Sequence, residues 1–129
     1  HAIVEKRRTG NDAKSEALSI IGDVRDKNVL LVDDEVLTGG SIANAVKLVR
    51  DEGAQDVYLA FVHPLLADPA ADRLAELNIQ EIITTNTVPI SAEKQAKLPN
   101  MTVLSIAPLL GEVILRANQG RSVGELFNE

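Results

Sequence analysis

The sequence contains no cysteine and no tryptophan, and its only aromatic residues are one tyrosine and two phenylalanines among 129 residues. The absence of cysteine excludes disulfides, a thiolate nucleophile and a cysteine-ligated zinc site. The scarcity of aromatics requires an aliphatic core. It also argues against a single-stranded nucleic-acid binder, because such proteins stack bases on aromatic side chains. No apolar run approaches the roughly 20 residues that a membrane-spanning helix needs.

The chain is acidic, with 19 aspartate and glutamate residues against 13 lysine and arginine residues and a formal net charge of -6. This balance argues against a broad nucleic-acid or anionic-membrane surface, although it leaves room for a local anion site. With 45% apolar residues, the composition is typical of one soluble globular domain. We therefore expect a cytoplasmic protein with no nucleic-acid partner and no membrane partner.

Short apolar runs alternate with amphipathic segments along most of the chain. The apolar runs predict strands over 2–4, 17–24, 29–32, 56–62, 79–84 and 101–106. The amphipathic segments predict helices over 41–51, 69–77 and 108–118. Residues 5–16 are rich in charge and predict an exposed, mobile loop, and residues 25–28 predict a turn. Strands that alternate with helices indicate an α/β protein with a mostly parallel, twisted sheet and helices on both faces.

Residue spacing also predicts which side chains face the core. The uninterrupted run over 29–32 is typical of a strand that is buried on both faces. Asp68 is placed to cap the helix over 69–77, and Gly53 and Gly120 to end the other two helices. The expected inward faces of those two helices are Ile42, Ala45, Val46 and Val49 in the first, and Leu110, Val113, Ile114 and Ala117 in the second.

The most informative stretch is "VDDEVLTGGS" (32–41), in which two carboxylates follow an apolar strand and a hydroxyl- and glycine-rich turn leads into a helix. In α/β sheets, ligands bind beyond the carboxyl ends of the strands. A helix N-terminus offers unpaired N–H groups and a partial positive charge, which together bind phosphate. The two carboxylates supply acceptors for sugar hydroxyls or oxygen ligands for Mg²⁺. A phosphorylated sugar carries a phosphate and hydroxyl groups a few ångströms apart, so it suits both parts of the stretch.

A purely structural interpretation stays open at this point. A Thr-Gly-Gly-Ser turn before a helix is often only a cap, with Ser41 as the capping residue, and adjacent carboxylates at a strand end are often solvated. The stretch is not a P-loop, because the Gly-Lys-Ser/Thr ending is absent, and it is not a Gly-x-Gly-x-x-Gly turn. Spacing alone does not decide between a phosphate site and a capped turn.

The same stretch resembles the loop that binds ribose 5-phosphate and phosphoribosyl diphosphate in the phosphoribosyltransferase superfamily. Three further stretches resemble one branch of it, the ribose-phosphate pyrophosphokinases: "EKRR" (5–8), "TTNT" (84–87) and "LSIAPLLGEVILRANQGRSVGELF" (104–127). The resemblance implies a phosphoribosyltransferase-type (type I) fold. It implies that residues 1–129 form one such domain, the C-terminal domain of a longer chain, in agreement with an opening at His1 that has no methionine.

The resemblance also implies roles for individual residues. Asp33 and Asp34 would bind the ribose hydroxyls with the help of Mg²⁺, which they would also ligate. The 5-phosphate would be held by Thr38, Gly39, Gly40 and Ser41. The catalytic side chains would be Lys6 and Arg8, placed over the transferred diphosphoryl group, whose developing negative charge their own charges suit. The sugar site would also be lined by Asn86 and Thr87.

The activity that the resemblance implies is the transfer of diphosphate from ATP to ribose 5-phosphate, giving phosphoribosyl diphosphate and AMP. The family's ATP-binding segments lie in the N-terminal half, so we expect this chain alone to be inactive. The family forms homo-oligomers, commonly hexamers. Two departures from the family's loop are Glu35, which stands in place of an apolar residue, and Leu37, which stands in place of a polar one. These departures keep open the alternative of a non-catalytic regulatory subunit. A nucleobase phosphoribosyltransferase stays open as well, because it uses the same loop for the same sugar phosphate.

Overall fold

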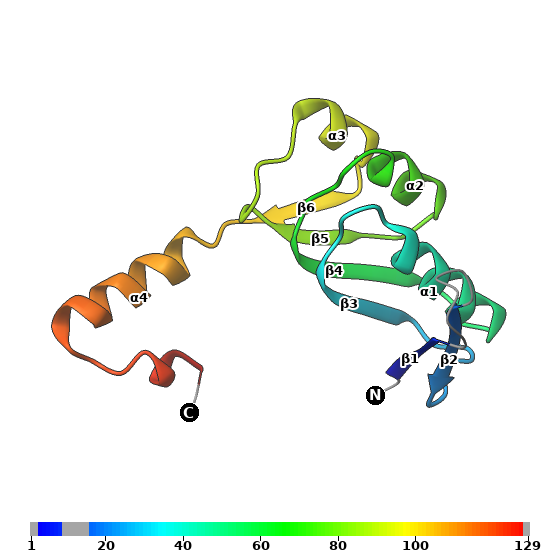
Figure 1. Cartoon of the computed structure of the whole chain (residues 1–129), viewed down its shortest axis with the longest axis horizontal. Helices are drawn as coiled ribbons and strands as arrows, with labels where there is room; N and C mark the ends of the chain where they lie inside the picture. The colour runs from blue at the N-terminus through cyan, green and yellow to red at the C-terminus, as the bar shows by residue number, and fades with distance from the viewer. Residues whose placement is uncertain (1–2, 9–15, 128–129) are drawn as a thin grey trace.

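The computed structural model describes the backbone of residues 3–8 and 16–127 and the side chains of residues 19–127. Its centre is a four-stranded parallel sheet in the order β3 (Val29–Glu35), β4 (Val57–His63), β5 (Ile82–Thr85) and β6 (Met101–Leu104) (Figure 1). The α/β class and the parallel sheet that the sequence predicts are therefore confirmed. Because the strands are parallel, their carboxyl ends all lie at one edge of the sheet.

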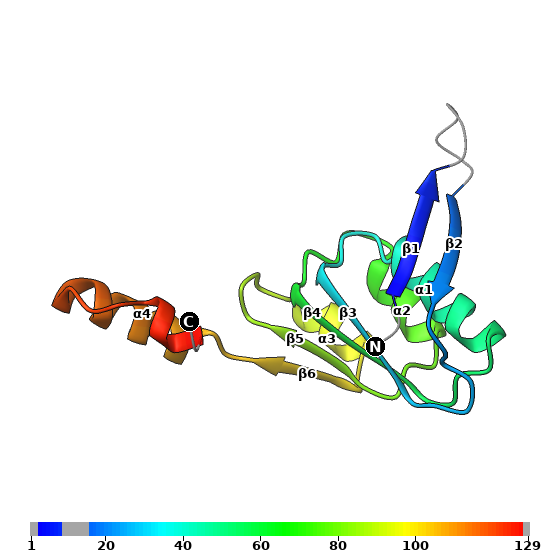
Figure 2. The same ribbon diagram turned by 90° about the horizontal axis from the view of Figure 1, so that it is seen from below.

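Three helices connect these strands: α1 (Gly40–Asp51), α2 (Ala70–Glu76) and α3 (Ala92–Lys97). The strands follow one another across the sheet in chain order. Right-handed crossovers between parallel strands in such an order place every connecting helix on the same face. Figure 2 shows α1, α2 and α3 on one side of the sheet, whereas the sequence predicts helices on both faces.

The core lies between these helices and the face of the sheet that they cover. It is aliphatic apart from Phe61, as the scarcity of aromatics requires. Leu59 and Ile82, from the two central strands, are both 0% exposed. The predicted inward residues Ile42, Val46 and Val49 of α1 are buried as well. The rest of the buried core consists of Val36, Val57, Leu66, Ala70, Ala71, Leu74, Ile79 and Leu98.

The opposite face of the sheet carries apolar side chains that are open to solvent. On β3, Leu30 is 56% exposed and Val32 is 75% exposed. Val62 and Leu104, on β4 and β6, are 43% and 52% exposed. The prediction that the strand over 29–32 is buried on both faces is therefore wrong. In the described part of the chain, the connecting helices cover only the other face, for the topological reason given above.

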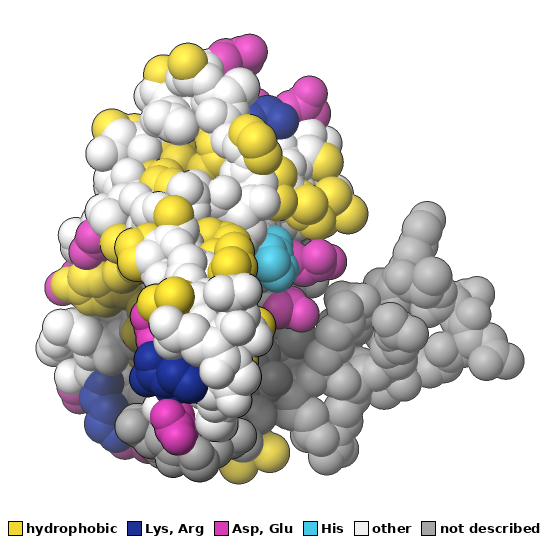
Figure 3. Space-filling view, turned by 90° about the vertical axis from the view of Figure 1, so that its left-hand side faces the viewer, with side chains coloured by type: hydrophobic (Ala, Val, Ile, Leu, Met, Phe, Trp, Pro, Cys, Tyr) yellow, Lys and Arg dark blue, Asp and Glu magenta, His cyan; other side chains and the backbone are white. Residues whose placement is uncertain are grey.

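Helix α4 (Ala107–Gln119) extends away from the sheet and is followed by a short 3₁₀ helix, η1 (Gly124–Phe127) (Figure 1). The helix and its end at Gly120, a left-handed residue with φ +67, are as predicted. Its expected burial is wrong, because no residue of α4 is buried, and Leu110 and Ile114 are 49% and 68% exposed. Hydrophobic side chains are spread over the surface seen from this end of the molecule (Figure 3).

The chain begins with an antiparallel hairpin, β1 (Ile3–Arg8) and β2 (Glu16–Ile21), which forms a sheet of its own. The charged residues 5–8, predicted as loop, continue the first strand instead, and Arg8 pairs with Glu16 at its end. Pairing with β2 satisfies the backbone groups along one edge of this segment, so its charge does not exclude a strand. Residues 9–15, the rest of the predicted loop, lie outside the described residues.

Several other strand ends lie up to three residues from their predicted positions, and two features of the connecting helices also differ from prediction. Asp68 does not cap α2. The helix begins after Pro69 without a side-chain cap among the described residues, and the Asp68 carboxylate lies 3.7 Å from the Lys94 ammonium. Helix α3 was not predicted, although Ser91 caps it by accepting a hydrogen bond from the backbone N–H of Lys94 at 3.3 Å. Among the described helices, none combines the length and the hydropathy of a membrane span.

Candidate functional site

The acidic pair lies in the last residues of β3, at the carboxyl edge of the sheet. The Oδ1 atom of Asp33 accepts a hydrogen bond from the backbone N–H of Asp34 at 2.9 Å. In the same way, Oδ1 of Asp34 accepts one from the backbone N–H of Glu35, also at 2.9 Å. One oxygen of each carboxylate is thus fixed by the backbone. The second oxygen of each is a candidate acceptor for a hydroxyl or a cation.

Three consecutive acidic residues concentrate negative charge at this edge. Partial burial raises the pKa of the Asp33 carboxyl above its ordinary value, since desolvation disfavours the charged form. The backbone N–H of Asp34 acts in the opposite direction and lowers this pKa, while the nearby charges of Asp34 and Glu35 raise it further. The site is therefore one where a bound cation or hydroxyl donors would relieve electrostatic repulsion.

The turn after the acidic residues ends at the first turn of α1. Gly39 precedes the helix with φ +72, a left-handed conformation that glycine adopts at little cost. Its carbonyl accepts a hydrogen bond from Ala43 N–H at 2.9 Å. Among the described residues, no side chain caps this helix, and its first turn holds no acidic residue. Ser41 lies inside the helix and is not the cap, which removes one part of the purely structural interpretation.

A pocket of about 150 Å³ opens at this point. Its lining brings Asp33 together with the predicted phosphate-binding residues Thr38, Gly39, Gly40 and Ser41, which approach it from β3, the turn and α1. The volume is about that of five water molecules, enough for a phosphate group. The remaining lining residues are Glu35, Val36, Leu37 and Ile42, so both departures from the family's loop border the pocket.

Asn86 and Thr87 lie at the carboxyl edge as well, just after β5, but they are not among the lining residues of this pocket. The Asn86 side chain accepts a hydrogen bond from Ile106 N–H at 2.9 Å and so holds the connection from β6 to α4. The Thr87 hydroxyl donates to the Val62 carbonyl at 3.1 Å and lies 3.0 Å from Nδ1 of His63. These bonds tie neighbouring strand ends together.

The predicted catalytic residues Lys6 and Arg8 both belong to strand β1, where Lys6 pairs with Leu18. Their side chains lie outside the described part of the structure. Their predicted role over the diphosphoryl group therefore stays a prediction.

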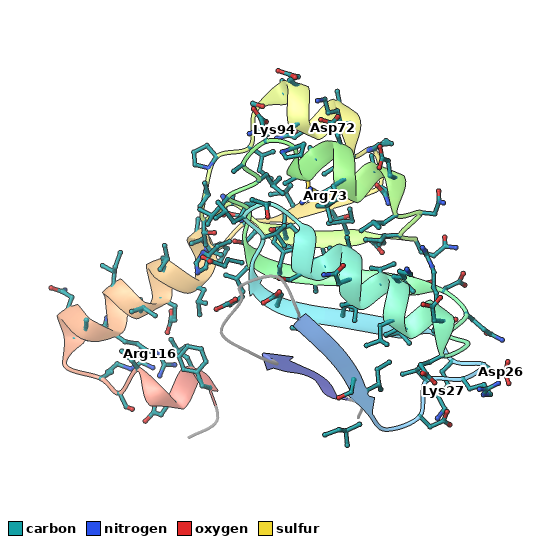
Figure 4. The ribbon with its side chains drawn as sticks, turned by 45° about the vertical axis from the view of Figure 1, so that its right-hand side comes forward. Asp26, Lys27, Asp72, Arg73, Lys94 and Arg116 are labelled. Atoms are coloured by element: carbon teal, nitrogen blue, oxygen red, sulfur yellow. The ribbon has the colours of Figure 1, made fainter. Side chains whose placement is uncertain are left out.

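One residue that the sequence did not single out contacts the turn. Arg73 lies on α2 (Figure 4). It donates a hydrogen bond from Nη1 to the carbonyl oxygen of Thr38. The two residues are 35 positions apart in the chain. The sequence predicts the helix that carries Arg73, but it does not predict that α2 packs beside the start of α1.

The chain matches a known protein family over most of its length. The family described as phosphoribosyl synthetase-associated domain matches residues 8–128. A ribose-phosphate pyrophosphokinase of Nostoc sp. is 43% identical over 126 residues, which are 98% of this chain and 37% of the relative. The chloroplastic ribose-phosphate pyrophosphokinase 1 of Arabidopsis thaliana is 44% identical over 126 residues, 98% of this chain and 30% of the relative.

A solved structure gives the same picture. The crystal structure of phosphoribosylpyrophosphate synthetase from Mycobacterium smegmatis matches with a TM-score of 0.76 and 47% identity, over 81% of this chain and 34% of that chain. This chain thus spans well under half of the length of the proteins it matches. The match in three dimensions includes the arrangement of a parallel sheet with helices described above.

Proposed function

This chain belongs to the phosphoribosyl synthetase-associated domain family, and we propose that it is the ribose 5-phosphate-binding part of a ribose-phosphate pyrophosphokinase. The observation that carries the proposal is the pocket that joins Asp33 to the uncapped start of α1 through Thr38, Gly39 and Gly40. It offers acceptors at one end and backbone donors at the other, which is the chemistry that a sugar phosphate requires.

In this proposal the two ends of the site bind different parts of the ligand. The N–H groups at the start of α1, with the hydroxyls of Thr38 and Ser41, donate to the phosphate oxygens. The free carboxylate oxygens of Asp33 and Asp34 accept hydrogen bonds from the ribose hydroxyls. Asn86 and Thr87 border the sugar from the end of β5, where their side chains also bond to the backbone of neighbouring segments.

We propose Mg²⁺ as the ion of this site. The donor set fits, because Mg²⁺ prefers oxygen ligands and is commonly held by one or two carboxylates together with water and substrate oxygens. The described residues contain no cluster of three or more metal-ligating side chains, so Asp33 and Asp34 would share the ion with the substrate. When bound, the ion would neutralise the charge of the acidic pair and of the diphosphoryl oxygens.

For the whole protein we propose the transfer of diphosphate from ATP to the 1-hydroxyl of ribose 5-phosphate, giving phosphoribosyl diphosphate and AMP. Lys6 and Arg8 would stabilise the negative charge that develops on the transferred group. The matched relatives are roughly two and a half to a little over three times as long as this chain. We therefore propose that the remainder supplies ATP recognition, that this chain alone is inactive, and that the whole protein is a cytoplasmic homo-oligomer.

One observation favours a second candidate, a regulatory subunit that binds sugar phosphate weakly. Glu35 and Leu37 border the pocket, and both make it a poorer site for an anion than the family's usual residues would. The carboxylate of Glu35 repels phosphate, and Leu37, at 51% exposure, offers it no hydrogen bond.

Calorimetric titration of the folded chain with ribose 5-phosphate and Mg²⁺ tests the proposed site. We expect saturable binding that Asp33→Asn and Asp34→Asn each weaken. Asp51→Asn, which removes the same charge from the exposed far end of α1, is the matched control and should bind like the wild type. Equal binding by all four proteins would contradict the proposed role of the acidic pair. No binding by a folded wild type would favour the regulatory alternative.

A further inference from the structure

Arg73 reaches the phosphate-binding turn from a separate helix. Its guanidinium donates to the carbonyl oxygen of Thr38, the residue before the two glycines. Its side chain then passes close to both glycines. A Cβ atom on Gly39 would lie 3.7 Å from Cδ of Arg73, and one on Gly40 would lie 3.6 Å from Nη1. The guanidinium therefore lies directly behind the backbone that borders the pocket.

The carboxylates nearest to Arg73 along the chain are engaged elsewhere. Asp72 pairs with the Lys97 ammonium at 2.9 Å, and Asp68 lies 3.7 Å from that of Lys94, so both face α3. No salt bridge involves Arg73 in the part of the chain whose side chains are described. Its positive charge is thus available to a group bound at the turn.

The pocket needs such a charge. An anion that enters it meets the acidic run Asp33, Asp34 and Glu35 on β3, two members of which border the pocket. The start of α1 contributes only about half a positive charge. A full guanidinium charge behind the turn opposes the repulsion from the acidic run.

The bond to Thr38 also restrains the backbone. It fixes the carbonyl of the peptide that precedes Gly39, whose left-handed φ turns the chain into α1. The direction of the following N–H groups depends on the orientation of these peptides. A guanidinium suits this task better than an ammonium, since its planar donors lose less freedom on binding.

We propose that Arg73 is a positioning residue of the anion site, which holds the Thr38–Gly40 backbone in its binding geometry and supplies positive charge to the bound phosphate group. The inference deepens the proposed function and rests on it for the identity of the ligand. It assigns a role in the site to a helix that the binding motif in the sequence does not include.

The test compares two ligands and four proteins by calorimetric titration. The ligands are ribose 5-phosphate with Mg²⁺ and inorganic phosphate. The proteins are the wild type, Arg73→Gln, Arg73→Lys and the control Arg50→Gln. Arg50 suits this role because it also donates to a backbone carbonyl, that of Asn78 at 2.9 Å, but from the last turn of α1, away from the pocket.

We expect Arg73→Gln to lower the affinity for both ligands by a similar factor of about ten, the usual order for a hydrogen bond made by a charged group. Arg73→Lys should recover part of this loss, because it keeps the charge but not the planar donors. Arg50→Gln should bind like the wild type. Each variant is checked for folding by thermal unfolding without ligand, and the titrations are run well below the lowest melting temperature.

Wild-type affinity of folded Arg73→Gln for inorganic phosphate would overturn the inference and leave the proposed function standing. Binding of phosphate that depends on Arg73, without binding of ribose 5-phosphate, would overturn the proposed function alone. Failure of the wild type to bind either ligand would overturn both. Should Arg73→Gln not fold, Arg73→Lys decides, because unchanged phosphate affinity of that variant would show that the bond from the planar guanidinium to Thr38 is not needed.

Discussion

The carboxylate of Asp33 accepts a hydrogen bond from the backbone N–H of Asp34 at 2.9 Å, and the same arrangement links Asp34 to Glu35. Each of the two aspartate side chains thereby bonds to the next peptide of the same strand. These bonds offset part of the repulsion between adjacent carboxylates, but burial and neighbouring charge still raise the pKa of Asp33. The folded chain therefore tolerates this cluster at some cost in stability, as functional sites often do.

Asp33→Asn should make the folded chain more stable at neutral pH. A raised pKa in the folded state means that the protonated form of Asp33 favours folding. This stabilisation is fully present below the ordinary carboxyl pKa of 3.8 and is lost as pH rises through the higher pKa of the folded state. Asparagine mimics the protonated form and keeps the oxygen that accepts from Asp34. We expect a gain of up to about 1 kcal/mol at pH 7, which disappears in acid.

Thermal unfolding of the two proteins as a function of pH measures this difference. Asp51→Asn, at the exposed end of α1, serves as the control for a general loss of one negative charge. If Asp33→Asn melted at the wild-type temperature or below it at pH 7, the cost assigned to the acidic cluster would be wrong.

The order of strands and helices could be predicted because each long element has a recognisable pattern of apolar residues within one continuous stretch of sequence. Apolar runs and 3.6-residue periodicity located the parallel strands and both long helices. Helix α3 escaped because its six residues are too few to show a period, although Ser91 marks its start. An all-apolar run such as 29–32 shows no alternation, so it does not reveal that Leu30 and Val32 face solvent.

The site was partly predictable for the same reason. Asp33, Thr38, Gly39, Gly40 and Ser41 lie within one short stretch, and the structure brings them to one pocket. The bond from Arg73 to Thr38 depends on the packing of α2 beside α1, a tertiary contact that local sequence does not encode. Likewise, the apolar face of α4 is visible in the sequence, but its exposure is not.

Gly39→Ala should destabilise the chain by about 1–2 kcal/mol, the cost of a left-handed conformation for a residue with a Cβ atom. The reason is the φ of +72 at Gly39, since space alone would admit a methyl group, whose nearest neighbour would be 3.7 Å away. Gly40→Ala is the matched control. Its neighbours are as distant, at 3.6 Å and beyond, and its φ is not in the left-handed region. Urea denaturation of both variants measures the difference, and equal midpoints would contradict the strain at Gly39.

Leu59→Ala and Val32→Ala should separate the covered face of the sheet from the open one. Leu59 is 0% exposed in the core, and its truncation should cost about 2–5 kcal/mol. Val32 is 75% exposed on the opposite face, and its truncation should cost no more than about 0.5 kcal/mol. Urea unfolding of the two variants and the wild type gives both values. A large loss from Val32→Ala would show that the open face is covered in solution.

Glu35→Gln should strengthen the binding of phosphate. Glu35 borders the pocket beside the turn, and its charge adds to that of Asp33, which is needed for the sugar hydroxyls in the proposed function. The charge of Glu35 has no such role. Its removal therefore reduces the repulsion of phosphate without reducing the attraction from the start of α1 and from Arg73. We expect an affinity for inorganic phosphate about two to five times that of the wild type, the range for a partly exposed charge. Glu52→Gln, just beyond the far end of α1, is the control.

The same variant separates the two candidate functions. If Glu35 alone weakens an otherwise intact site, Glu35→Gln should increase the affinity for ribose 5-phosphate by the same factor as for phosphate, because the acidic pair that accepts the sugar hydroxyls is unchanged. If only phosphate binding improved, the part of the site that binds the sugar would be impaired. This result would support the regulatory alternative. Titration of both ligands at two salt concentrations completes the test, since a purely electrostatic gain must shrink as salt screens the charge.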